Sequence, residues 1–176
     1  MNQLRGTPLK RFLRHWRRAN PPGGEVVLLL QSVAYPVNVG SLFRIADALH
    51  VHEMVLTGIT PPPTSRSIQK VSRDRQNDVP WRYEERPEDA IRALKQDGYH
   101  ISAIEITDVS LPYCDVFFPP RTCLVLGNED HGVTRSVLEL CDSAVFVPMY
   151  GHGLSLNVHV SAAIVLSHIA QQNRFE

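Results

Sequence analysis

The sequence has 176 residues, of which 43% are hydrophobic and 20% are charged, and its formal net charge is zero. This composition is typical of an ordinary globular protein and leaves room for one domain with a substantial core. No apolar run approaches the roughly 18 residues that a membrane-spanning helix needs, and no signal peptide precedes the first strand-like segment.

The N-terminal segment concentrates basic charge. Residues 1–24 contain six basic residues and no acidic one, whereas residues 25–176 contain all 18 acidic residues and 12 basic ones. A basic arm on a mildly acidic domain predicts an electrostatic contact with a polyanion such as RNA. Phe12 and Trp16 favour a segment that docks or stacks. A solvated amphipathic helix is the alternative interpretation of this arm.

The first strand and helix of the domain follow the arm. The apolar run Glu25–Gln31, bounded on its N-terminal side by prolines and glycines, predicts a buried strand. Pro36 precedes a helix in which apolar residues recur from Leu42 at the spacing of one buried face. Arg44 falls just off this face, near a helix start, where a cation opposes the helix macrodipole. A snorkelling arginine and a functional arginine are both open at this point.

The rest of the chain alternates strand-like and helix-like segments. Strands are predicted at 52–57, 79–84, 99–106, 122–126 and 144–147, and helices at 87–96, 134–140 and 155–171. Residues 58–64 read as a rigid loop with three consecutive prolines, and residues 65–78 are polar and basic. The alternation predicts an α/β fold with a mostly parallel sheet and helices on both faces. We therefore divide the chain into a basic arm, residues 1–24, and one domain, residues 25–176.

Two glycine-centred loops come directly after predicted strands in the C-terminal third. They are LGNEDHGV at 126–133 and VPMYGHGLSLN at 147–157. Ligands bind at the carboxyl ends of strands in open parallel sheets, and glycines let the backbone approach them closely. Neither a P-loop nor a dinucleotide fingerprint is present in the sequence. The two loops predict a pocket for a small organic ligand with a planar, hydrogen-bonding ring.

Cysteine and histidine usage argues against a metal centre. The three cysteines, Cys114, Cys123 and Cys141, are odd in number and lack CxxC spacing, which favours reduced thiols in a cytoplasmic protein over a disulfide frame or a zinc site. Among the eight histidines, His50 and His52 form the closest pair, without a third ligand in register. We expect no bound metal.

Three ordered motifs make a specific resemblance. They read NVGSLFRIA at 38–46, LVLGNEDHGV at 124–133 and VPMYGHGLSLNVHVSAAIV at 147–165. With these motifs the chain resembles the SpoU (TrmH-like) family of SPOUT methyltransferases, which use S-adenosylmethionine to methylate ribose 2′-oxygens in tRNA or rRNA. The resemblance covers roughly residues 25–170, which is nearly everything except the basic arm.

The resemblance implies a set of site residues where the motifs match. The family's catalytic positions correspond to Asn38, Arg44, Glu129, Ser155 and Asn157. The positions whose backbone surrounds S-adenosylmethionine correspond to Ile104, Gly127, Val147 and Leu156, with S-adenosylhomocysteine as the product. One departure is visible, because His159 stands where a serine often follows SLNV. His152 and His159 could face the site, although nothing in the chemistry requires them.

Simpler interpretations of two residues stay open. Glu129 could be an acid ahead of a helix N-terminus, and Asn157 could satisfy loop backbone groups near the final helix. The apolar stripe of that helix, which includes Val160, Ala163 and Ile164, is expected to form core or subunit interface.

The resemblance gives Arg44 a place at the reacting ribose. The family account makes this arginine the base, but a guanidinium with a pKa above about 12 gives up its proton reluctantly. Our hypothesis is that Arg44 orients phosphate and hydroxyl and stabilises the developing oxyanion charge. Asn38 is expected to fix Arg44, and Glu129 to orient Asn38 or a substrate group.

The resemblance further implies a C-terminal trefoil knot and a homodimer with sites shared between subunits. RNA is the implied partner, with tRNA as the first choice and rRNA as the second. The predicted backbone contacts are Arg11, Arg14, Arg66, Lys70 and Arg73. Two alternatives remain: a non-catalytic RNA-binding module of the same fold, and an unrelated small α/β enzyme with another adenine-bearing ligand.

Overall fold

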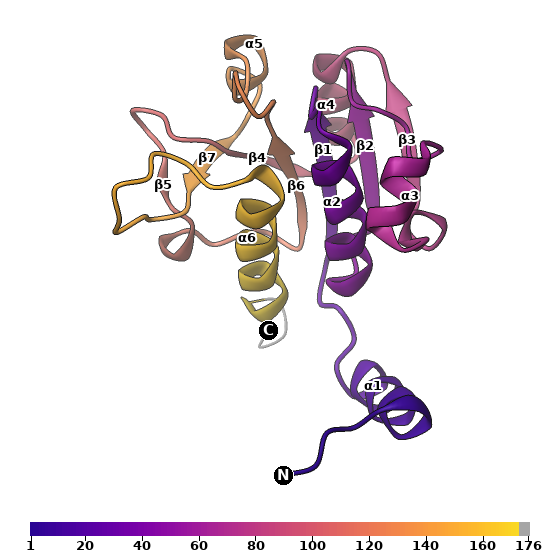
Figure 1. Cartoon of the computed structure of the whole chain (residues 1–176). Coiled ribbons are helices and arrows are strands. Elements are labelled where there is room, and N and C mark those ends of the chain that lie inside the picture. The colour runs from indigo at the N-terminus through magenta and orange to yellow at the C-terminus, as the bar shows by residue number, and fades with distance from the viewer. Residues whose placement is uncertain (173–176) are drawn as a thin grey trace.

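A seven-stranded sheet forms the centre of the computed structural model, which describes residues 1–172 (Figure 1). The strand order is β3-β2-β1-β6-β4-β7-β5, and every neighbouring pair is parallel. The strands are β1 (Glu25–Gln31), β2 (Glu53–Thr57), β3 (Trp81–Glu84), β4 (His100–Ile104), β5 (Leu111–Pro112), β6 (Arg121–Leu126) and β7 (Ser143–Phe146). This arrangement confirms the predicted α/β class with a parallel sheet.

Helices cover both faces of the sheet. They are α2 (Pro36–Ala48), α3 (Arg66–Ser72), α4 (Pro87–Gln96), α5 (Arg135–Leu138) and α6 (Val158–Gln172), with 3₁₀ turns at Arg75–Asn77 and Tyr113–Asp115. Alternate residues of β1 serve the two faces, as the two-residue period of a strand requires. Leu28 and Leu30 join the core under α2, α3 and α6, whereas Val27 and Leu29 join the core under α4 and α5. The prediction of helices on both faces is confirmed.

Several element boundaries differ from the sequence-based prediction. The short strand β5 was not predicted, because two residues that include a proline and pair only with β7 at the sheet edge leave no periodic pattern. The last helix begins at Val158 and not at residue 155, because the carbonyl of Asn157 accepts the N–H groups of Val160 and Ser161. Residues 155–157 therefore belong to the preceding loop.

Gly40 allows two helices to approach each other closely. It lies in the second turn of α2, where a Cβ would come within 2.8 Å of Cβ of Val71 and 3.0 Å of the carbonyl of Ile68. The glycine thus lets α3 pack closely against α2.

The helix α1 (Gly6–Ala19) lies apart from the domain, as Figure 1 shows below the sheet. None of its residues is buried. One face carries the exposed side chains of Leu9, Phe12 and Leu13, and basic residues occupy much of the remainder. The predicted basic arm is therefore a helix that the domain does not cover.

The three cysteines are free. Cys114 is exposed, Cys123 is buried within β6, and Cys141 is half-buried. Burial raises the pKa of Cys123 above its usual range and raises the pKa of Cys141 to about 11. Both groups are thus held as protonated thiols at neutral pH.

Candidate active site

A cavity of about 410 Å³ opens where the loops after β4, β6 and β7 meet. These three strands are neighbours in the sheet, so their carboxyl ends lie at one edge. The volume is within the range of small-molecule sites. The cavity is lined by all four residues predicted to hold the methyl donor, Ile104, Gly127, Val147 and Leu156. The three predicted catalytic residues Glu129, Ser155 and Asn157 line it as well.

The loop after β6 folds tightly back on itself. The backbone groups of Asn128 and Gly132 exchange two hydrogen bonds of 3.1 and 2.8 Å. A Cβ on Gly127 would overlap the backbone of Gly132 and Val133, and Gly132 has a φ of +64°. Glycine is required at both positions, because the loop packs against its own backbone at Gly127 and needs a positive φ at Gly132.

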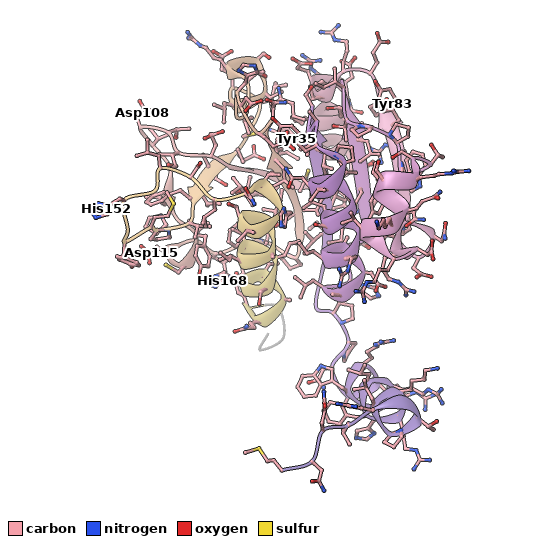
Figure 2. All side chains as sticks on the ribbon, in the orientation of Figure 1. Tyr35, Tyr83, Asp108, Asp115, His152 and His168 are labelled. Carbon is pink, nitrogen blue, oxygen red and sulfur yellow. The ribbon has the colours of Figure 1, made fainter. Side chains whose placement is uncertain are left out.

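Glu129 joins this loop to the N-terminal end of α2. Its carboxylate accepts hydrogen bonds from the backbone N–H groups of Ala34 at 2.9 Å and Tyr35 at 3.1 Å, and from Nδ2 of Asn38 at 2.7 Å. Burial alone would raise the pKa of Glu129, but these hydrogen bonds outweigh it and hold the pKa below its usual value. Tyr35, labelled in Figure 2, is the extended residue directly before α2.

Glu129 fits both the simpler interpretation, an acid at a helix N-terminus, and the expectation that it contacts Asn38. The residue is an acid at a helix N-terminus, where unpaired N–H groups favour a negative charge. The helix is α2, however, and not the helix that follows Glu129 in the sequence. The expected contact between Glu129 and Asn38 is present.

Asn38 also contacts the last helix. The amide oxygen Oδ1 of this buried side chain lies 2.8 Å from Nδ1 of His159, in the first turn of α6. A chain of hydrogen bonds therefore runs from Glu129 through Asn38 to His159. The sequence marked His159 as a departure from a pattern that could face the site, but no spacing in the chain could reveal its partner on α2.

Arg44 lies outside the cavity of its own chain. Its side chain is exposed on α2 and makes no hydrogen bond or ion pair within residues 1–172. The expected contact between Asn38 and Arg44 is wrong, because six residues along a helix turn the two side chains about 120° apart. Arg44 therefore points away from the hydrogen bonds of Asn38.

The loop between β7 and α6 places Ser155 and Asn157 at the rim of the cavity. Both side chains are exposed. The carbonyl of Asn157 accepts the first N–H groups of α6, whereas no side-chain hydrogen bond of Asn157 to loop backbone is present within residues 1–172. His152 lies at the outer tip of this loop, as Figure 2 shows, and does not line the cavity.

Glu105 is a cavity residue that the sequence analysis missed. It lines the cavity directly after β4, and its carboxylate accepts the backbone N–H groups of Ile106 at 3.0 Å and Val133 at 2.9 Å. An acid directly after a buried strand was the available signal. Because Glu105 accepts from the loop after β6, it fixes the position of that loop.

A second groove, of about 510 Å³, runs beside the ring of His159. It is lined by residues of α2 and α6 and by the turn at Tyr113–Asp115. Apolar side chains predominate in its walls, among them Ile45, Val160 and Ile164. These half-buried residues leave an apolar face uncovered along α6.

The predicted RNA contacts form two separate groups. Arg66, Lys70 and Arg73 are exposed on α3 and at its end, and α3 packs against α2. Arg11 and Arg14 are exposed on α1, which Figure 1 shows apart from the domain. The structure does not bring these two groups together.

Within residues 1–172, no three His, Cys, Asp or Glu side chains are grouped so that they could hold a metal ion. Over the same residues, the helices are too short or too polar for any of them to traverse a bilayer.

A match to a family model shows to which protein family the chain belongs. The model of the SpoU rRNA Methylase family matches residues 25–167. The chain belongs to this family. The match confirms the resemblance drawn from the three motifs, and residues 1–24 lie outside it.

The curated relatives of this chain include enzymes named for two kinds of RNA. The chain is 28% identical over 150 residues to tRNA (guanosine(18)-2′-O)-methyltransferase of Escherichia coli K12, and the match covers 85% of this chain and 65% of the relative. It is 32% identical over 155 residues to 23S rRNA (guanosine-2′-O-)-methyltransferase RlmB of Neisseria meningitidis, covering 88% and 60%. The tRNA (guanosine(18)-2′-O)-methyltransferase of Thermus thermophilus is 30% identical, with 89% and 78% covered. The chain thus spans less than two thirds of the length of the first two relatives.

Solved structures share the fold of this SpoU family member. The AdoMet-bound rRNA methyltransferase from Sinorhizobium meliloti aligns with a TM-score of 0.80 at 25% identity, covering 88% of this chain and 59% of that one. The A. aeolicus TrmH/SpoU tRNA modifying enzyme aligns with a TM-score of 0.78 at 24% identity, covering 93% and 83%.

Proposed function

We propose that the protein is an S-adenosylmethionine-dependent RNA methyltransferase that transfers a methyl group to a ribose 2′-oxygen. The observation that carries the proposal is that the second and third family motifs line one cavity, to which a hydrogen bond joins the first motif. Loops from β6 and β7 line it, and Glu129 at its wall binds Asn38 of the first motif. Named relatives that methylate guanosine 2′-oxygens in tRNA and in 23S rRNA support the same activity.

The cavity suits the methyl donor. Ile104, Val147 and Leu156 supply apolar walls for a planar adenine ring. Gly127, which also lines the cavity, lets the loop after β6 close tightly against its own backbone. When bound there, S-adenosylmethionine supplies an electrophilic methyl group on a sulfonium. We propose Asn38, Arg44, Glu129, Ser155 and Asn157 as the catalytic residues, with Ser155 and Asn157 orienting groups at the cavity rim.

We propose that a homodimer completes the site. Arg44 is exposed and does not line the cavity of its own chain, while the apolar groove along α2 and α6 offers a face for a second copy. In such a dimer Arg44 of one subunit serves the cavity of the other. There it holds an RNA phosphate and the reacting hydroxyl and stabilises the developing negative charge.

Finer assignments of substrate, RNA contacts, topology and localisation complete the proposal. The RNA is tRNA, with rRNA as the alternative, and its backbone contacts Arg66, Lys70 and Arg73 of the domain, residues 25–176. The arm, residues 1–24, adds Arg11 and Arg14. The C-terminal segment forms a trefoil knot around the cavity, and the protein is cytoplasmic, in keeping with three free cysteines.

The first test is calorimetric titration with S-adenosylhomocysteine, followed by transfer of tritiated methyl groups from S-adenosylmethionine to purified tRNA and rRNA. Binding together with label in one RNA pool supports the methyltransferase and selects its substrate. Binding of RNA without any transfer favours a non-catalytic RNA-binding module. Failure to bind S-adenosylhomocysteine, with binding of another nucleotide, favours an unrelated α/β enzyme.

A further inference from the structure

His159 makes a contact that the family motifs do not explain. The half-buried ring lies in the first turn of α6, and its Nδ1 lies 2.8 Å from Oδ1 of Asn38 on α2. We propose, on the basis of the function proposed above, that Nε2 of His159 accepts the proton of the ribose 2′-hydroxyl during methyl transfer. Arg44 then stabilises charge and need not act as the base.

The hydrogen-bond partners determine which ring nitrogen carries the proton. The carboxylate of Glu129, whose pKa is held low, can only accept, so Asn38 must turn its amide nitrogen toward Glu129 and its oxygen toward His159. That oxygen can only accept in turn, so Nδ1 of His159 is the protonated nitrogen. In the neutral ring Nε2 then has a free lone pair, and it makes no hydrogen bond within residues 1–172.

The surroundings of the ring favour its neutral form. Burial between α2 and α6 lowers the pKa of His159 from its ordinary value. Tyr113 and His168 are the titratable groups that line the same groove, and their ring centroids lie 5.3 Å apart. Glu129 faces His159 only through Asn38. A histidine that is neutral at pH 7 and oriented by a third group is well suited to take a proton from a hydroxyl.

His159 stands on the border between the cavity and the groove. Val158 and Ser161 of the same helical turn line the cavity, whereas His159 and Val160 line the groove. A ribose bound at this border has the methyl donor on one side and the imidazole on the other. The groove is also the face through which the proposed second subunit brings Arg44.

The proposed step needs no further reactant. The proton of the 2′-hydroxyl passes to Nε2, and the oxygen forms a bond to the methyl carbon as the bond between methyl and sulfur breaks. The electron pair of that bond stays on sulfur, which leaves a neutral thioether. The imidazolium of His159 then releases its proton to water.

The substitution His159→Asn separates proton acceptance from positioning. The amide nitrogen of asparagine can replace the Nδ1 donor toward Asn38, but asparagine offers no base. The matched control is His100→Asn, because His100 is also half-buried and makes one side-chain hydrogen bond, to Ser143 on β7, away from the site. The measurements are kcat against pH, the affinity for S-adenosylhomocysteine, and ¹⁵N chemical shifts of the histidine ring nitrogens.

We expect His159→Asn to lower kcat by about 100-fold or more while the affinity for S-adenosylhomocysteine stays within twofold. The wild-type kcat is expected to fall as the pH decreases through the pKa of His159, which burial holds below the ordinary value of 6.5, and His159→Asn to lose this dependence. The ¹⁵N shifts are expected to assign the proton of wild-type His159 to Nδ1. His100→Asn is expected to match the wild type.

Three results would overturn the proposal: a kcat of His159→Asn within threefold of wild type, a proton on Nε2 in the neutral ring, or equal losses of kcat and S-adenosylhomocysteine affinity. Failure of the underlying function looks different. In that case the wild type itself transfers no methyl group to tRNA or rRNA, and the proposed roles fall together.

Discussion

Nδ2 of Asn38 lies 2.7 Å from a carboxylate oxygen of Glu129, although 91 positions separate the two residues in the sequence. The bond fastens the loop after β6 to the start of α2, and the two backbone N–H groups that Glu129 also accepts strengthen this connection. The side chain that shapes the cavity wall thus also sets the position of the helix that bears Arg44. Stability and activity are therefore coupled at Glu129.

Glu129→Gln is expected to destabilise the fold. The amide keeps one accepting oxygen, and its NH₂ group faces N–H donors that then lack a partner. We expect a loss of about 2 kcal/mol in the free energy of unfolding. For a protein of this size the melting temperature falls by about 4–8 °C, measured by calorimetry. Asp130→Asn is the control, since this exposed neighbour accepts only the Tyr35 hydroxyl at 3.3 Å, and an equal loss there would contradict the prediction.

The contribution of Glu129 to stability is expected to depend on pH. Because its pKa in the folded protein lies below the ordinary value of 4.5, the stabilisation is present above pH 4.5 and is lost as the pH falls through the folded pKa. The difference in unfolding free energy between wild type and Glu129→Gln should therefore be constant from pH 7 to 5 and shrink below 4.5. Urea titrations at fixed protein concentration measure it. A difference that persists unchanged at pH 3 would argue against an ionised carboxylate.

Arg44 is expected to matter for transfer and not for the fold. We expect Arg44→Ala to lower kcat by about 100-fold and Arg44→Lys by about tenfold or more, since lysine lacks the planar fork. The melting temperature and the S-adenosylhomocysteine affinity should not change, because the exposed side chain has no partner within residues 1–172. Arg92→Lys on α4 serves as control. Near-normal turnover of Arg44→Lys would exclude a role for the fork.

Gly127→Ala is expected to weaken strongly the binding of S-adenosylhomocysteine in the cavity. A methyl group there overlaps the backbone of Gly132 and Val133, so the loop after β6 has to move. We expect a loss of S-adenosylhomocysteine affinity of about 100-fold or more in calorimetry, equivalent to about 2.7 kcal/mol. Gly153→Ala is the matched control, since nothing lies within 4 Å of the added Cβ. Equal affinities of the two variants would show that binding of S-adenosylhomocysteine does not need the tight loop after β6.

Neutralising the arm is expected to weaken RNA binding without affecting stability. Arg11→Gln combined with Arg14→Gln removes two charges from a helix that buries no residue, so the melting temperature should stay within about 1 °C. The slope of log affinity against log salt should fall by roughly 1.5. Filter binding with tRNA at several salt concentrations measures this slope. The pair Arg86→Gln and Arg92→Gln, around α4, should leave it unchanged.

Local signals explain which elements could be predicted from the sequence. β1 and α4 match their predicted limits to the residue, because prolines and glycines mark the boundary before β1 and a proline opens α4. Of the seven cavity residues that were predicted, all but Ile104 lie within motifs, which identify positions without requiring a geometry. Both kinds of signal lie within a few consecutive residues.

Contacts between distant segments could not be predicted in this way. The bond between Asn38 and His159 depends on how α2 packs against α6, and no periodicity encodes that packing. The angle between Arg44 and Asn38 follows from helical geometry, but only the structure shows that Arg44 does not line the cavity. Glu105 likewise gains its role from a loop 28 residues later in the chain.

The pairing of β1 with β6 has a consequence for how the chain folds. Val26 lies opposite Thr122, so β1, an interior strand of the sheet, cannot pair on one side until the ribosome has made nearly a hundred further residues. Until then the hydrogen-bonding edge of β1 and its leucines stay open, which slows folding and invites association between nascent chains. A fragment that stops before residue 121 lacks β6 and leaves one edge of β1 unpaired. We therefore expect this fragment to aggregate instead of forming half a domain.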